Sequence, residues 1–298
     1  MTLYTHQGSN IRKTWLLMAI FLIIVISIGW AFSAVYNQPV ILYGAVIFSI
    51  LMNIFSYWYS DKLVIKMTGA KPVTNDSHPD FYNIVENLSI TAGIPMPKLY
   101  IIDDPSPNAF ATGRNPEHAA VAATTGLLSI LNRAELEGVI AHELSHIGNR
   151  DMLVSTVAVV LVGFVTLLSD FFLRMSMFSG RDRDNRVSGI IVAAGFLLAI
   201  LSPIIATLIQ LAISRKREFL ADASGALLTR YPEGLASALQ KISAYSRPMV
   251  RANHATAHLF ISNPFGATDG KKGVGFLTKI FMTHPPIQDR INALVGKN

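Results

Sequence analysis

Four long runs of apolar residues limit what this chain can fold into. They cover residues 15–35, 40–59, 152–173 and 188–214. Each run is long enough to supply the roughly 20 residues that a helix needs to cross a bilayer. A spanning segment has to satisfy its own backbone hydrogen bonds, and a helix does so. The sequence therefore predicts four candidate transmembrane helices, with the rest of the chain folded outside the membrane.

The composition and the charge agree with a membrane protein. Of the 298 residues, 51% are hydrophobic and only 15% are charged, whereas soluble domains carry about 25% charged residues. The net charge is +6, and the basic residues lie beside the apolar runs. This placement favours an anionic membrane face over nucleic acid as the partner. Because the sequence has no cysteine, a metal site has to use His, Asp or Glu.

The first two runs are interpreted as a transmembrane hairpin with both ends in the cytoplasm. The first run is longer than the apolar part of a signal peptide, which has about 7–15 residues. Lys62, Lys66 and Lys71 follow the second run and support this orientation. The second hairpin, over residues 152–214, is predicted either to span fully or to insert partly. Its linker carries several arginines, which conflict with the positive-inside tendency if the linker lies outside.

The segments outside the runs predict a mixed α+β fold that is mainly helical. Residues 79–92 are predicted to form a helix and residues 98–103 a strand. The segments "NAFATG" and "HAAVAATTG" are expected to be extended and joined by the turn "RNPE". The C-terminal part is expected to be mainly helical, with Pro232 and Pro285 each in the first turn of a helix.

The segment "NRAELEGVIAHELSHIGN" predicts a helix that carries a metal site. Asn132 is a candidate N-cap, and Glu135 stands three residues later, as in a capping box. The four-residue spacing places His142 and His146 on one face, where two imidazoles can bind one zinc ion. Glu143 is rotated by about 100° from His142, so it can act on a water without binding the metal. The alternative is a helix whose histidines face solvent or a polar core.

A catalytic zinc site needs a third protein ligand and an open position. The third and fourth apolar runs have similar lengths, so a hairpin returns the chain near residue 215 to the level of residue 150. Glu218 is the first carboxylate after this return and is the predicted third ligand, with a surface salt bridge as the alternative. Asp222 is predicted to accept the second N–H of a ligand histidine. Asp151 is expected to lie too far along the same helix to be a ligand.

The motifs "HELSH", "REFLADASGALLT" and "FMTHPPIQDRI", with "DDPSPNAFATG" before them, resemble the HtpX family of bacterial membrane zinc proteases. These are relatives of the CAAX prenyl proteases. The resemblance covers nearly the whole chain, including the order of the four apolar runs. It implies a heat-shock-linked, zinc-dependent endopeptidase of zincin-like fold in the inner membrane, with its active site facing the cytoplasm. It matches His142, His146 and Glu218 to the metal ligands and Glu143 to the catalytic glutamate.

This interpretation divides the chain into four parts. Residues 1–60 form the first hairpin, and residues 61–151 the first part of a cytoplasmic protease domain with the zinc helix. Residues 152–214 form the second hairpin. Residues 215–298 complete the protease domain with the third ligand. The zinc helix is expected to continue into the third run, with His146 about 9 Å before it, so that the site lies at the membrane surface.

The expected chemistry is hydrolysis of peptide bonds by one zinc ion and Glu143. Zinc polarises the scissile carbonyl and activates water, and Glu143 moves a proton from that water to the leaving amine. His284 in "THPP" is the first candidate for stabilising the oxyanion, and Arg290 is the second. The alternatives are a helix-capping role for His284 and an ion pair for Arg290. Manganese, cobalt and iron also suit the ligand set.

Substrate is expected to bind as a strand added to an exposed sheet edge. The segment "AAVAATTG", which contains Ala122, is the predicted edge. The segment "NAFA", with Asn108, Ala109 and Phe110, is the predicted neighbouring wall. The alternative is two ordinary buried strands.

The segment "NHATAHLF" repeats the four-residue histidine spacing with His254 and His258. It lacks an adjacent acid that could act as a base. We therefore interpret these two histidines as a structural pair.

The hypothesised function is quality control of membrane proteins. The expected partners are polypeptide substrates and the lipid bilayer, not nucleic acid, and oligomerisation is left open. Three rival functions fit the sequence less well. A non-catalytic zinc adaptor is disfavoured because it needs no base such as Glu143. A transporter is disfavoured because the runs hold few ionisable residues. A prenyl-protein protease is the closest rival, but its chamber is typically built with more than four spans.

Overall fold

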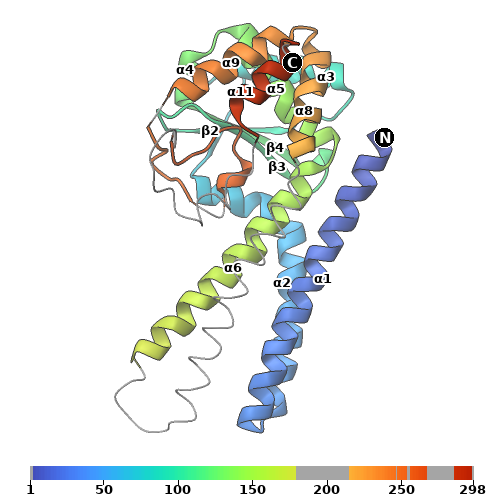
Figure 1. Cartoon of the computed structure of the whole chain (residues 1–298), viewed down its shortest axis with the longest axis vertical. Helices are drawn as coiled ribbons and strands as arrows, with labels where there is room; N and C mark the ends of the chain where they lie inside the picture. Colours follow the sequence, from blue (N-terminus) through green and yellow to red (C-terminus); the bar gives the residue numbers. More distant parts are fainter. Residues whose placement is uncertain (1–2, 179–214, 246, 254–255, 267–284, 297–298) are drawn as a thin grey trace.

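The computed structural model describes residues 3–178, 215–245, 247–253, 256–266 and 285–296. Two long helices, α1 (Leu3–Tyr36) and α2 (Pro39–Thr68), project from a head that contains a small sheet. A third helix, α6 (Asp151–Phe178), leaves the head in the same general direction (Figure 1). The fourth apolar run and His284 lie outside the described residues.

The head is built on a four-stranded sheet with the order β1-β2-β4-β3. Its strands are β1 (Lys71–Pro72), β2 (Lys98–Ile102), β3 (Ala109–Gly113) and β4 (Ala119–Thr124). β2 and β4 are parallel, whereas β1 pairs with β2, and β3 with β4, in antiparallel fashion. β4 therefore lies inside the sheet and β3 at its edge. The prediction that "AAVAATTG" forms the exposed edge is wrong, because β2 occupies the second side of β4.

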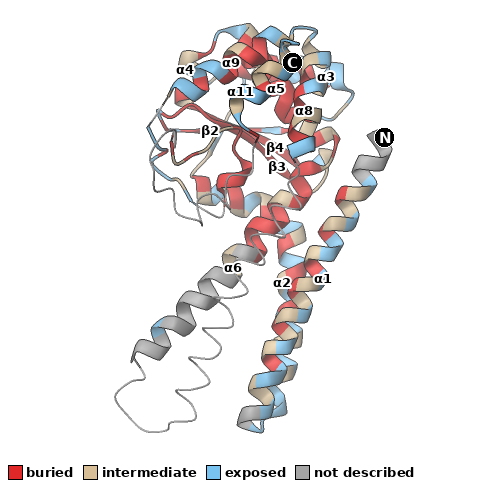
Figure 2. Cartoon of the chain, in the orientation of Figure 1, coloured by how far each residue is buried: buried red, intermediate tan, exposed pale blue. Residues whose placement is uncertain are grey.

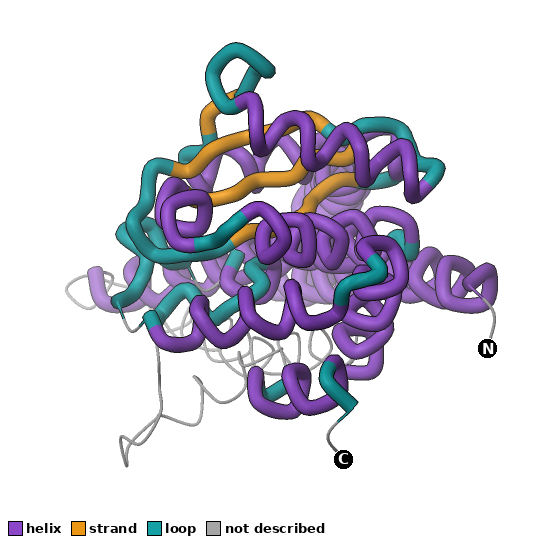
Figure 3. The backbone as a smooth tube through the Cα atoms, turned by 90° about the horizontal axis from the view of Figure 1, so that it is seen from above, coloured by secondary structure: helices purple, strands orange, loops and turns teal. Residues whose placement is uncertain are grey.

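Side chains that alternate along the strands divide the core into two layers. On one face, Leu99, Ala111 and Val121 pack with helices α3 (Pro79–Ala92), α5 (Arg133–Gly148) and α9 (Pro232–Ala244). On the other face, Phe110 and Ala122 pack with the end of α2, the start of α6 and a segment around residue 260. Figure 2 shows this buried core in the head, and Figure 3 shows the strands from above, running side by side among the helices.

Most of the predicted element boundaries agree with the structure. The helix at residues 79–92 is α3, and it ends where Gly93 adopts a φ of 66°. Pro232 begins α9, as predicted. Contrary to the prediction, Pro285 does not lie in the first turn of a helix. The helix α11 (Ile287–Leu294) starts two residues later, with Pro286 as its N-cap. The remaining elements are α4 (Thr125–Ile130), α8 (Arg215–Thr229) and the short helices η1 (Pro116–His118) and η3 (Ala257–Leu259).

The helices α5 and α6 are separate, although the sequence predicted one continuous helix. α5 ends at Gly148, and α6 begins at Asp151. Between them Arg150 has a φ of 57°, in the left-handed region. A residue in this conformation cannot continue a right-handed helix. The start of α6 is therefore free to take a new direction.

Two helices in the described part of the chain are long and apolar enough to cross a membrane. They are Gly8–Ala34 within α1 and Pro39–Thr68, and only 22% and 17% of their apolar windows are buried. Large side chains are exposed on both, such as Trp15 and Trp30 of α1 and Tyr43 of α2, and Figure 2 shows few buried residues along most of their length. An apolar surface of this kind indicates an apolar environment. Within α6, the apolar stretch Asp151–Leu161 is shorter than a membrane span requires. The structure therefore does not confirm four transmembrane helices.

The start of α6 packs within the protein. Leu153, Val157 and Leu161 form a buried cluster with Met18 and Phe21 of α1. The third apolar run is helical, as predicted, but its first turns face α1, α2 and the sheet.

Candidate active site

The helix that carries the predicted ligands begins at a complete capping box. The Asn132 side chain accepts a hydrogen bond from the Glu135 N–H at 3.0 Å, and Glu135 accepts one from the Asn132 N–H at 2.8 Å. Ser237 and Lys241 of α9 each donate to the same buried carboxylate at 2.7 Å. The predicted cap is confirmed, and it fixes both the start of α5 and its contact with α9.

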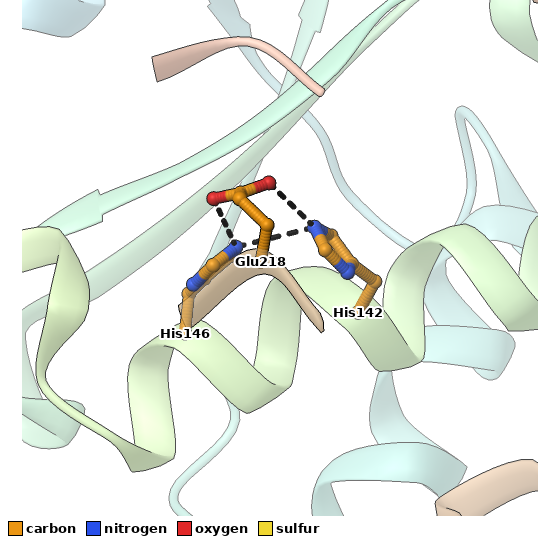
Figure 4. Close-up of side chains that lie close together, drawn as sticks. All are labelled: His142, His146 and Glu218. Atoms are coloured by element: carbon orange, nitrogen blue, oxygen red, sulfur yellow. Dashed lines mark hydrogen bonds and ion pairs between the residues drawn. The ribbon is translucent and has the colours of Figure 1, made fainter. Parts of the chain in front are cut away.

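Three side chains from α5 and α8 turn toward one point (Figure 4). The Nε2 atoms of His142 and His146 lie 3.2 Å apart. The carboxylate of Glu218 lies 3.9 Å from the first of these atoms and 3.6 Å from the second. One ligand atom from each residue lies within 4.8 Å of the others. The structure therefore brings together the three residues that the predicted return of the chain near residue 215 places side by side.

The donor atoms of this cluster fit a divalent metal ion. Two imidazole nitrogens and one carboxylate form a known ligand set of catalytic zinc sites. Tetrahedral ligands at about 2.0–2.1 Å from zinc lie about 3.3 Å from one another. The observed separations of 3.2, 3.6 and 3.9 Å are close to this value. The cluster could close around an ion with only small movements of its side chains.

A carboxylate holds the second ring nitrogen of each histidine. His142 Nδ1 lies 2.9 Å from Asp222, and His146 Nδ1 lies 3.1 Å from Asp151. These contacts fix the ring orientations and leave both Nε2 atoms for a metal. Asp222 lies where the sequence placed it. The contact of Asp151 was not predicted, because Asp151 was expected to continue the same helix. The break at Arg150 turns it back toward His146.

Close backbone packing allows α8 to present its acids to α5. A Cβ atom added at Gly225 would lie 2.9 Å from the backbone nitrogen of His142. A glycine at this crossing lets the two helices approach to backbone contact. Glu218 and Asp222 precede Gly225 on the same face of α8 and reach the histidines because of this approach.

Arg290 of α11 joins the site through an ion pair. It is fully buried, and its Nε and Nη2 atoms donate to the two carboxylate oxygens of Asp222 at 2.8 and 2.7 Å. Its Nη1 atom lies 3.9 Å from Glu218. The structure therefore shows Arg290 in an ion pair, which was the alternative to a role in stabilising the oxyanion. His284, the first candidate for that role, lies outside the described residues.

Burial and charge shift the pKa values of the site in opposite directions. Burial, aided by the charge of Arg290, lowers the pKa of His142 to about 4. Burial also lowers the pKa of His146, but the hydrogen bond of Asp151 and the nearby carboxylates outweigh it and raise that pKa to about 9. Burial raises the pKa of Asp222, but its bonds to Arg290 lower it to about 2. Without metal, His142 is therefore neutral and His146 protonated at neutral pH.

The cavity around the cluster is lined by Glu143 and by the edge of the sheet. Glu143 is 2% exposed and shares this cavity with Ala111 of β3 and Ser155 of α6. His258 also lines it, and its Nε2 atom lies 3.2 Å from the backbone oxygen of Ser155. The sequence did not predict His258 at the site. Its companion His254 lies outside the described residues.

The predicted substrate-binding residues differ in their placement. Asn108, Ala109 and Phe110 are buried at the start of the edge strand. There the Ile261 N–H donates to the Ala109 oxygen at 2.9 Å, so this part of the edge is already paired. Ala122 is fully buried in the inner strand β4. The contact of these four residues with substrate stays a prediction.

The fold and the site define a metallopeptidase of the class that carries the His-Glu-x-x-His motif. Residues 76–298 match the model of Peptidase family M48, and the chain belongs to this family. It is a metalloprotease with a possible metal site at His142, His146 and Glu218.

Curated relatives named "Protease HtpX homolog" match almost the whole chain. The one from Caldanaerobacter subterraneus is 46% identical over 98% of this chain and 97% of its own. The one from Thermoanaerobacter pseudethanolicus is 47% identical with the same coverage. The one from Thermococcus sibiricus is 48% identical over 95% of this chain and 94% of its own. The HtpX resemblance seen in the motifs is confirmed.

A solved structure shares the fold. The crystal structure of S. mikatae Ste24p matches with a TM-score of 0.51 and 18% identity, covering 95% of this chain and 66% of the Ste24p chain. At this identity the likeness concerns the fold.

Proposed function

We propose that this chain is a zinc-dependent endopeptidase of the bacterial inner membrane, with its active site on the cytoplasmic side. It hydrolyses peptide bonds in misfolded or damaged membrane proteins as part of a stress response. The observation that carries the proposal is the pair of Nε2 atoms 3.2 Å apart, beside Glu218, in a cavity that also contains Glu143.

In this proposal His142, His146 and Glu218 hold one zinc ion. When bound, zinc supplies a Lewis acid that polarises the scissile carbonyl and lowers the pKa of a water. Asp222 and Asp151 keep the two imidazole rings in the orientation that binding requires. Their contacts support a site that is organised before the metal binds.

Glu143 acts as the general base and acid. It takes a proton from the attacking water and passes it to the leaving amine. Its burial places this carboxylate where surrounding water does not compete for the proton. Glu143 follows His142 directly in α5 and is therefore turned away from the face that carries the two histidines. It lines the cavity but is not one of the three proposed metal ligands.

An extended substrate is proposed to pair with the edge strand β3. The first residue of β3 already pairs with Ile261, so the substrate is proposed to pair with residues 111–113. Ala111 lines the cavity together with Glu143 and His146. A peptide added along this edge passes the proposed metal ligands. Asn108 and Phe110 support the strand from within the core.

The head is proposed to sit on the membrane surface. Trp15 and Tyr57 stack with a centroid separation of 6.3 Å, and Arg114 of the head lies 4.5 Å from the ring centroid of Trp58. Aromatic side chains of this kind gather at membrane interfaces. Lys62 follows them on α2 and supports a cytoplasmic head. A protease placed there reaches segments of membrane proteins that leave the bilayer.

The test is cleavage of an unfolded protein such as casein, by the full chain in detergent, with metal content measured in parallel. We expect the wild type to cleave with zinc and to stop with a chelator. Glu143→Gln is expected to keep its zinc and lose activity by about 10²–10⁴-fold. The matched control is Glu137→Gln, the same change at a partly exposed position of α5, which is expected to stay active.

Two outcomes would contradict parts of the proposal. If the wild type and Glu143→Gln both bind zinc and neither cleaves, the chain is a non-catalytic zinc protein. If Glu143→Gln cleaves as fast as the wild type, the role given to Glu143 is wrong. The substrate class is tested in vesicles, where a destabilised membrane protein is expected to be cleaved faster than its stable parent.

A further inference from the structure

A buried asparagine of α1 contacts the head beside the active site. Asn10 is 1% exposed. Its Nδ2 atom donates to Asp151 at 2.6 Å and to the backbone oxygen of Asn149 at 3.1 Å. Its Oδ1 atom accepts a hydrogen bond from Arg217 at 2.7 Å. One side chain of the N-terminal apolar helix therefore binds the junction of α5 and α6 and the start of α8.

The partners of Asn10 are the direct neighbours of the proposed metal ligands. Asp151 uses its other carboxylate oxygen to hold His146 Nδ1 at 3.1 Å. Arg217 immediately precedes Glu218, and its Nη1 atom lies 3.5 Å from Asp151. A chain of two contacts, from Asn10 to Asp151 and from Asp151 to His146, thus runs from α1 to a ligand histidine. The contact of Asn10 with Arg217 reaches the residue next to the ligand carboxylate.

Asp151 contacts two partners at once. Its Oδ2 atom holds His146, and its Oδ1 atom lies 3.5 Å from the buried cation Arg217. Asn10 supplies the short hydrogen bonds to both Asp151 and Arg217. Without it, the buried Arg217 would lose its 2.7 Å acceptor, and a buried charge left without a partner is costly. Asp151 would then turn toward Arg217 and release the ring of His146.

Anchoring of α1 does not need this asparagine. Met18, Phe21 and Val25 of α1 already pack against Leu153 and Val157 of α6 in an apolar cluster. A polar side chain adds little to such packing and requires all its hydrogen bonds to be satisfied. The place of Asn10 is therefore explained by its partners.

We propose that Asn10 is a positioning residue of the metal centre, acting through Asp151 on His146. The N-terminal apolar helix is then a working part of the protease and not only its anchor. This inference rests on the proposed zinc site, since His146 has to be a ligand for its orientation to matter. Loss of a residue that orients a ligand typically costs 10–100-fold in metal affinity. Because Asn10 is one contact further away, the expected loss is about tenfold.

The experiment measures zinc affinity of the full chain in detergent, by competition with a chelating dye after metal removal. The variants are Asn10→Ala, Asn10→Ser and Thr14→Ala. Thr14 is the matched control: it is buried on the same helix one turn later and donates to the Asn10 backbone oxygen. We expect a loss of about tenfold for Asn10→Ala, a smaller loss for Asn10→Ser and no change beyond twofold for Thr14→Ala. The absorption spectrum of cobalt-loaded protein is expected to change only in the Asn10 variants.

A double-mutant cycle with Asp151→Ala tests the route. If Asn10 acts through Asp151, Asn10→Ala causes no further loss of affinity in that background. The inference is overturned if Asn10→Ala, or Asn10→Ser should the first variant not fold, binds zinc like the wild type. It is also overturned if the losses at the two positions add in full. If the wild type binds zinc no better than His146→Ala, the proposed metal site itself fails and the inference falls with it.

Discussion

Gly225 offers a direct test of how tightly the two metal-binding helices have to pack. In Gly225→Ala, the new Cβ atom would lie 2.9 Å from the His142 backbone nitrogen, whereas ordinary contacts begin at 3.4 Å. The obstructing atoms belong to the backbone of α5, so no side chain can move aside. α8 therefore has to withdraw from α5 by about half an ångström.

The expected cost divides into stability and metal binding. Overpacking of a buried contact costs about 1–3 kcal/mol, and alanine regains about 1 kcal/mol of helix propensity. The net loss is about 0–2 kcal/mol, a fall of a few degrees in melting temperature for a chain of this size. Metal sites tolerate ligand displacements of about 0.2 Å. Withdrawal of Glu218 and Asp222 is therefore expected to weaken zinc binding by about tenfold or more.

The assay combines thermal unfolding of the metal-free protein with competition for zinc by a chelating dye. Gly148→Ala is the matched control, because it makes the same change in α5 at a position with nothing within 4 Å of the added atom. It is expected to leave zinc affinity unchanged. If Gly225→Ala binds zinc as tightly as the wild type and cleaves at the same rate, the site does not depend on this helix contact, and the reasoning is refuted.

Two further predictions concern pH. In the metal-free protein the pKa of His146 is raised to about 9, so at pH 7 zinc has to displace its proton. Calorimetry in buffers of different ionisation enthalpy is expected to show release of about one proton per zinc. The zinc affinity is also expected to rise with pH until about pH 9. If no proton is released on zinc binding, the pKa assigned to His146 is wrong. Burial raises the pKa of Glu135, but hydrogen bonds from Lys241, Ser237 and the Asn132 N–H outweigh it, so its pKa is lowered. Its ionised form thus stabilises the fold above the ordinary carboxyl pKa, and this contribution is lost as the pH falls through the lowered value. Lys241→Met is therefore expected to destabilise the metal-free protein by about 1–2 kcal/mol at pH 7 and by less below pH 4; an equal loss at both values would show that packing of the lysine stem matters instead of charge.

Local sequence cues were enough to predict the start of the zinc helix and its two histidines. The capping box of Asn132 and Glu135 depends only on spacing within one helical turn. Glu218 required one non-local step, the matched lengths of two apolar runs, and the structure brings it to the histidines. The capping box and the histidine pair could be predicted because they depend on helix geometry alone.

Other features depend on how distant segments meet. The inner position of β4 is set by β2, which no local cue places beside it. One signal was present, because "AAVAAT" is a continuous run of small apolar residues, which is typical of a strand covered on both faces. The break before Asp151 also had a cue in Gly148 and Asn149, residues that favour helix ends. A lone asparagine near the start of an apolar run, as at Asn10, carries no cue to its distant partners.

The length of α1 has a consequence for how deeply the protein can sit in a bilayer. Its apolar stretch Gly8–Ala34 has 27 residues, a length of about 40 Å, whereas the hydrocarbon core is about 30 Å thick. The first turns lie beside the head, because Asn10 is buried in contact with Asp151 and Arg217. The exposed large apolar side chains begin at Trp15, and the helix from there to Ala34 spans about 30 Å at 1.5 Å per residue. In the proposed membrane orientation, the hydrophobic length left for lipid is therefore close to the thickness of the hydrocarbon core. This match would keep the head close to the lipid headgroups.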